Sequence, residues 1–72
     1  MNYYKVTVTV TSVSKWEEYK EQVFFKSLFA ARYMAKKYFA CADVNEVVVT
    51  DETTGEIMYS VDYKDGEYDP CG

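Results

Sequence analysis

The side chains best able to do chemistry in this 72-residue chain are twelve Asp and Glu carboxylates and two cysteine thiols, because histidine is absent. Without an imidazole the chain lacks the commonest general base, and Ser-His and Cys-His nucleophile pairs are excluded. Adjacent carboxylates occur at Glu17–Glu18 and at Asp51–Glu52, a pattern typical of a solvated surface. The domain is also too small to enclose a substrate pocket of about 300 Å³. The sequence therefore predicts that the protein is not an enzyme.

Metal and cofactor chemistry has equally little support in the residue pattern. Cys41 and Cys71 lie 30 residues apart, which matches no zinc-ligand spacing. The stretch 51–56 lacks the alternating ligands of a calcium loop, and the three glycines are too dispersed for a phosphate-binding loop. We expect no metal, no cofactor and two free thiols, with Cys41 partly buried.

Charge is distributed unevenly along the chain. Residues 1–42 contain seven Lys and Arg against three acidic residues, a net charge of +4, whereas residues 43–72 contain one lysine against nine acidic residues, a net charge of −8. The two halves either face each other within one fold or leave an acidic surface that attracts a basic partner. With a net charge of −4 overall, the chain lacks the dominant positive field that nucleic-acid binding needs.

Residues 3–11 alternate strictly between two kinds of side chain. Val6, Val8 and Val10 fall on one face, whereas lysine and threonine fall on the other. A period of two with β-branched residues predicts a β-strand. One apolar face beside one wettable face is typical of an antiparallel sheet that is covered on one side.

Residues 14–26 fit both a helical and a strand period, so the pattern leaves their structure open. One helix from residue 14 to residue 40 would measure about 40 Å at 1.5 Å per residue, which is too long for a compact domain of this size. We therefore favour a second strand over residues 17–25, with a longer helix as the alternative.

Residues 27–40 predict a helix. Good helix formers dominate, and Leu28, Ala31 and Ala35 repeat at intervals of three and four. Ser27 is suited to cap the N-terminus of this helix. The two alanines would allow the helix to lie close to the valine face of the first strand.

Residues 46–63 predict a β-hairpin whose turn contains Gly55, a residue that readily adopts a positive φ. The element order is then ββαββ, a two-layer α+β fold with one helix packed on one face of an antiparallel sheet; βαββ with a longer helix is the alternative. We assign residues 1–64 to this single domain and residues 65–72 to an acidic, flexible tail. No apolar run approaches the roughly 20 residues of a membrane span and no signal peptide is recognisable, so we expect a cytoplasmic protein that does not contact a membrane.

Two segments carry a resemblance to known sequences. Ser-Leu-Phe-Ala-Ala-Arg-Tyr-Met-Ala-Lys-Lys-Tyr (27–38), followed by Val-Val-Val-Thr-Asp-Glu-Thr-Thr-Gly-Glu-Ile (47–57), resembles a group of small uncharacterised bacterial and phage reading frames. In that group an alanine-bearing helix precedes a strand and a Thr-Gly-Glu turn. The resemblance implies a bacterial or mobile-element origin and no particular activity.

Aromatic and basic side chains remain on the helix once its apolar stripe is assigned to the core. Positions three and four apart share a face of a helix, and a solvated face does not need aromatic rings. We predict a contact surface made of Phe29, Arg32, Tyr33 and Lys36. The end of the chain offers a second, acidic surface made of Asp62, Asp65, Glu67 and Asp69.

These surfaces give three functional hypotheses. Aromatic residues make up 18% of the chain, and Tyr and Trp anchor protein interfaces. This composition favours a non-catalytic protein-interaction domain, whose partner is either an unidentified protein or a second copy of the chain in a homodimer. The first alternative is an acidic decoy or inhibitor of a basic or nucleic-acid-binding protein. The second is nucleic-acid binding through the helix and the first hairpin, which the net charge disfavours.

Overall fold

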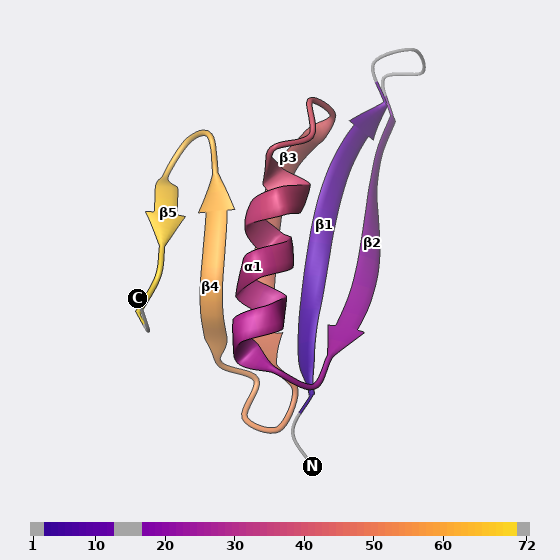
Figure 1. Ribbon diagram of the computed structural model, residues 1–72. Coiled ribbons are helices and arrows are strands. Elements are labelled where there is room, and N and C mark those ends of the chain that lie inside the picture. The colour runs from indigo at the N-terminus through magenta and orange to yellow at the C-terminus, as the bar shows by residue number, and fades with distance from the viewer. Residues whose placement is uncertain (1–2, 13–16, 71–72) are drawn as a thin grey trace.

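The computed structural model describes residues 3–12 and 17–70 of the chain. One helix lies on one face of an antiparallel sheet whose strand order is β2-β1-β3-β4-β5 (Figure 1). The predicted class, a two-layer α+β fold with one helix on an antiparallel sheet, is confirmed. The elements of the described chain are β1 (Tyr4–Ser12), β2 (Glu17–Phe25), α1 (Leu28–Phe39), β3 (Val44–Asp51), β4 (Ile57–Asp62) and β5 (Gly66–Tyr68).

The segment that the sequence pattern left open is a strand. β2 pairs with β1 along its whole length, from Tyr4 opposite Phe25 to Ser12 opposite Glu17, without a shift in register. This continuous backbone pairing outweighs the helical spacing of the aromatic residues in the segment. The alternative order βαββ with a longer helix is therefore wrong.

The predicted order ββαββ is also wrong at its end, because the chain forms a fifth strand. β5 pairs antiparallel with β4, with Ser60 opposite Tyr68 and Asp62 opposite Gly66. The return between the strands is tight: Gly66 has a φ of +80°, and the amide of Asp65 donates to the Asp62 carboxylate at 2.5 Å. A strand of three residues is too short to show alternation, so the pattern favoured a flexible tail where β5 lies.

The boundaries of α1 agree with the predicted helix to within a residue. The hydroxyl of Ser27 accepts a hydrogen bond from the amide of Ala30 at 3.3 Å and so caps the helix. Lys36 and Lys37 occupy the last turn, where positive charge interacts favourably with the helix dipole. Within the described ranges, no helix is both long and apolar enough to cross a membrane.

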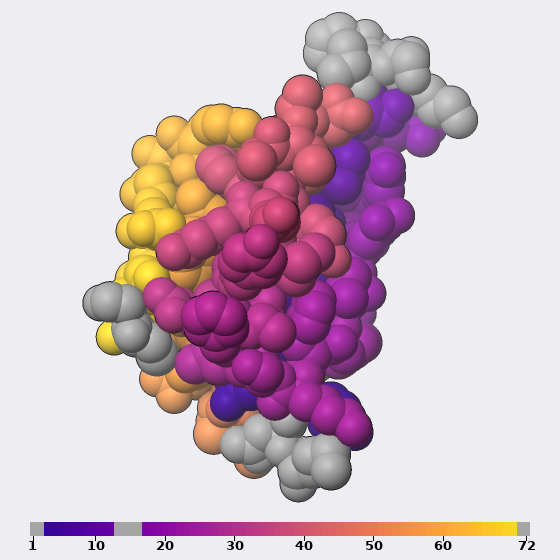
Figure 2. Space-filling view, in the orientation of Figure 1, coloured from indigo at the N-terminus to yellow at the C-terminus, as the bar shows by residue number. Residues whose placement is uncertain are grey.

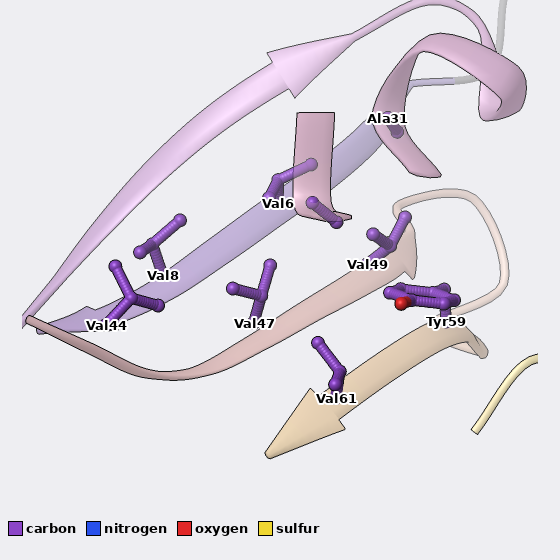
Figure 3. Packing of buried hydrophobic residues seen from close by; sticks show 9 residues of the cluster. Val6, Val8, Ala31, Val44, Val47, Val49, Tyr59 and Val61 are labelled. Carbon is purple, nitrogen blue, oxygen red and sulfur yellow. The ribbon is translucent and has the colours of Figure 1, made fainter. Parts of the chain in front are cut away.

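The core lies between α1 and the centre of the sheet (Figure 3). Burying one valine side chain stabilises the fold by roughly 1.5–3 kcal/mol, and the small side chains of Ala31 and Ala35 bring the helix close to these valines. The predicted contact between the valine face of the first strand and the alanine stripe of the helix is confirmed. The buried apolar residues are Val6, Val8, Ala31, Ala35, Val44, Val47, Val49, Tyr59 and Val61.

The other face of the sheet carries no helix in the described chain (Figure 1). Thr7 and Thr9 of β1 lie on this open face, opposite in direction to the buried valines. Thr9 is nevertheless only 5% exposed, because it lies in register between Lys20 of β2 and Glu46 of β3. The open face therefore carries polar residues, but its central residue Thr9 is shielded from solvent by its neighbours in β2 and β3.

Candidate functional site

The outer side of α1 presents two exposed aromatic rings. Phe29 and Tyr33 are four residues apart, so they share one side of the helix, and their exposed fractions are 76% and 52%. Lys37 continues this line by one more turn, and its Nζ atom lies 5.0 Å from the centre of the Tyr33 ring, within range of a cation–π contact. We call Phe29, Tyr33 and Lys37 the aromatic stripe. Figure 2 shows the side of the molecule from which α1 projects in front of the sheet.

Arg32 and Lys36, which the sequence grouped with the two aromatic residues, lean toward the C-terminal strands. The Nη2 atom of Arg32 lies 2.5 Å from Oδ2 of Asp69, with both side chains mostly buried. The Nζ atom of Lys36 lies 5.8 Å from the centre of the Tyr59 ring. The structure thus brings together only two of the four predicted residues, Phe29 and Tyr33, and joins Lys37 to them.

A polar cluster holds β5 against the rest of the fold. The Tyr59 hydroxyl donates a hydrogen bond to Oε2 of Glu67 at 2.5 Å, and the Arg32–Asp69 ion pair ties the residue after β5 to the helix. We call Arg32, Tyr59, Glu67 and Asp69 the β5 clasp. Charge-assisted hydrogen bonds of this kind are about twice as strong as neutral ones, so the clasp compensates for the shortness of β5.

The Tyr59 hydroxyl couples folding to alkaline pH. Burial raises the pKa of Tyr59 well above its ordinary value near 10, and the hydrogen bond to Glu67 and the negative charge of Glu67 raise this pKa further. A folded-state pKa above the unfolded value means that the stabilisation is complete below pH 10 and is lost as pH rises toward the folded-state pKa.

We therefore expect the ionisation of Tyr59 to lower the free energy of unfolding by about 1.4 kcal/mol per pH unit once pH exceeds about 10. Tyr59→Phe should be less stable at neutral pH, because the hydrogen bond is lost, but its stability should decline less above pH 10. Denaturant unfolding followed by circular dichroism at several pH values measures both quantities. Parallel pH curves for the two proteins would show that Tyr59 does not carry the effect.

Three of the four carboxylates of the predicted acidic surface, those of Asp62, Glu67 and Asp69, take part in contacts within the chain, whereas Asp65 is exposed. Glu67 and Asp69 belong to the β5 clasp, and Asp62 accepts the Asp65 amide in the β4–β5 turn. These carboxylates have structural roles, which the sequence alone did not indicate because their partners are set by the position of β5.

Metal-binding groups and cysteine thiols are the next features to consider among the described residues. Among them, no group of three or more His, Cys, Asp and Glu side chains is arranged to hold a metal ion. Cys41 is exposed, with a free thiol, rather than partly buried as the sequence predicted, because it follows the end of α1 and precedes the first buried residue of β3. Cys71 lies outside the described residues.

The fold and its surfaces define a class of protein: a two-layer α+β domain with an aromatic stripe on its single helix and a polar clasp at one end of its sheet. No protein-family model, no curated protein and no solved structure matches the chain.

Proposed function

We propose that the protein is a non-catalytic protein-interaction domain that binds its partner through the aromatic stripe. The observation that carries the proposal is the exposure of Phe29, which at 76% is the highest among the large hydrophobic residues of the described chain. An exposed ring pair on a rigid helix supplies contact area at small cost in conformational entropy. The tertiary fold does not need these two rings, since Ala31 and Ala35 supply the buried side of the helix.

The chemistry of α1 indicates the kind of partner. The helix contains three basic residues, Arg32, Lys36 and Lys37, and no acidic residue, although the whole chain is acidic. Helices that dock by side chains four apart commonly lie in an apolar groove of the partner. The partner that fits is therefore a protein with an apolar groove for Phe29 and Tyr33 and carboxylates near Lys37.

The other two hypotheses gain no support from the contacts. Two of the basic residues that nucleic acid would use are paired with carboxylates: Lys5 lies 3.5 Å from Glu52, and Arg32 lies 2.5 Å from Asp69. An acidic decoy would need its carboxylates free, yet Glu67 accepts the Tyr59 hydroxyl. We therefore propose neither.

The double variant Phe29→Ser/Tyr33→Ser tests the proposed contact. We expect a change in stability within about 0.5 kcal/mol, because Phe29 is largely exposed, Tyr33 is half exposed and neither belongs to the buried core. Partner binding should weaken by about 2 kcal/mol or more, a roughly 30-fold rise in Kd, because buried aromatic anchors dominate interface energies. Quantitative affinity capture with mass spectrometry, followed by calorimetry on the captured protein, measures the loss.

A matched control removes two exposed apolar side chains, one of them aromatic, from the opposite face of the sheet. Ile57 and Tyr68 are also exposed, and their register with Thr50 and Ser60 places them on the open face of the sheet. Ile57→Ser/Tyr68→Ser should keep the captured partner. If both double variants capture the same proteins as the wild type, the aromatic stripe is not the contact surface.

A further inference from the structure

β2 is a long edge strand whose outer edge is unpaired in the described chain. It has nine residues, and it stands at the end of the strand order, so no described strand pairs with its outer edge. It contains no proline, and its pairing with β1 has no bulge, although proteins commonly use both features to protect an edge. The opposite edge, β5, has only three residues and is held by the β5 clasp.

The residues of β2 limit how two copies of this edge could meet. Two identical edges that pair antiparallel are related by a two-fold axis perpendicular to the sheet, so one residue lies opposite itself and both helices stay on the same side. Centring the pair on Lys20 or Glu21 puts identical charges together. Centring it on Val23 puts Lys20 opposite Lys26. Centring it on Gln22 or on Phe24 brings no like charges into opposition, but the Phe24-centred register creates no ion pair.

The Gln22-centred register also creates complementary pairs on both faces. On the open face, Glu18 lies opposite Lys26 of the second copy, an ion pair that the symmetry repeats. On the helix side, Tyr19 lies opposite Phe25 of the second copy, and this aromatic pair is also repeated. Cross-strand pairs of these two types are the ones that stabilise sheets.

The same register covers surface that the single chain leaves in water. α1 lies mainly over β3 and β1, and much less over β2 (Figure 1). Tyr19, on the helix side, is consequently 47% exposed, and Phe24, on the open face that no described helix covers, is 56% exposed. Phe24 would then lie opposite Lys20 of the second copy, whose aliphatic stem packs well on a ring.

From this geometry we propose that β2 is a self-recognition edge, at which two copies of the chain pair antiparallel around Gln22 to form one continuous ten-stranded sheet. The proposal goes beyond the function proposed above, because it uses a different surface. The aromatic stripes of both copies project from the same side of the joined sheet and remain free for a partner.

Charge reversal tests the pairing in solution. Glu18→Lys places a lysine opposite Lys26 at both ends of the interface and should weaken dimerisation roughly tenfold or more. Glu18→Lys/Lys26→Glu restores both pairs and should recover the dimer. Sedimentation equilibrium over a range of concentrations measures each Kd. A wild type that stays monomeric at millimolar concentration would overturn the proposal.

A thiol at the symmetry axis tests the register itself. In a background with Cys41→Ser and Cys71→Ser, Gln22→Cys should form an intermolecular disulfide on mild oxidation, because directly opposite Cα atoms lie about 4.5–5.5 Å apart. Lys20→Cys lies on the same face, but its two copies would be about 14 Å apart, so it should not crosslink. Equal crosslinking at both positions would contradict this register. A dimer lost in Phe29→Ser/Tyr33→Ser but kept in Glu18→Lys would move the contact to the helix.

Discussion

Val6→Asp should abolish folding. Val6 of β1 is fully buried, and it lies in register between Val23 of β2 and Val49 of β3. The substitution forfeits roughly 1.5–3 kcal/mol of apolar burial and places a carboxylate among valines, at a further cost of several kcal/mol. A domain of this size has a total stability of only about 4–11 kcal/mol, so the combined loss leaves little or no folded protein.

Thr7→Asp is the matched control, because it places the same charge one residue further along the same strand. Thr7 faces the open side of the sheet between Gln22 and Val48, where the new carboxylate reaches water. We expect this variant to fold with a stability loss of about 1 kcal/mol or less. Far-ultraviolet circular dichroism and the dispersion of amide signals in NMR distinguish the two. Retention of the folded spectrum by Val6→Asp would contradict the assignment of this valine face to the core.

β1 and α1 could be predicted because each shows its own period over enough residues. β1 alternates over nine residues, and the buried Ala31 and Ala35 of α1 repeat at a helical interval. Periodicity gives the direction of a side chain but not its exposure. Thr9 has the predicted direction, yet its neighbours in β2 and β3 bury it, and those neighbours are fixed by tertiary pairing.

β5 escaped prediction because what stabilises it is remote in sequence. The strand has three residues, and the ion pair that follows it joins Arg32 to Asp69, separated by 37 positions. The intervening Gly66 turn alone is compatible with a free tail. The local sequence pattern therefore placed the end of the predicted domain after the last clearly alternating strand, although one more strand, β5, follows.

The contact surface was predicted in part for the same reason. Phe29 and Tyr33 are one turn apart, so helical spacing alone places them together. Arg32 follows Phe29 by three residues and Lys36 follows Tyr33 by three, so helical spacing also places these two side chains near the aromatic rings. Their contacts with Asp69 and Tyr59 depend on where β4 and β5 lie, which the local pattern does not show. Lys37 could have been found, because it follows Tyr33 by four residues.

Arg32→Met should be the most damaging change at the edge of the fold. It keeps an unbranched side chain of similar helix propensity but leaves the Asp69 carboxylate, only 16% exposed, without its cation. Removing one partner of a fully buried pair costs about 3–5 kcal/mol, and partial exposure lessens this cost through solvent screening. We expect a loss of about 2 kcal/mol on that basis, concentrated in β5, where amide hydrogen exchange should accelerate more than in β1.

Two further variants separate the buried charge from a general loss of contacts. Lys5→Met removes the ion pair with Glu52, which is more exposed than the Arg32–Asp69 pair, and should cost less than about 1 kcal/mol. Arg32→Met/Asp69→Leu removes both buried charges and should recover much of the loss, because no unpaired carboxylate remains. Denaturant unfolding of these variants and of Asp69→Leu alone gives the four stabilities that the comparison needs, and hydrogen exchange locates the change. If the double variant is as unstable as the sum of its single variants, the attraction between Arg32 and Asp69 is not what holds β5, and the hydrogen bond from Tyr59 to Glu67 becomes its principal anchor.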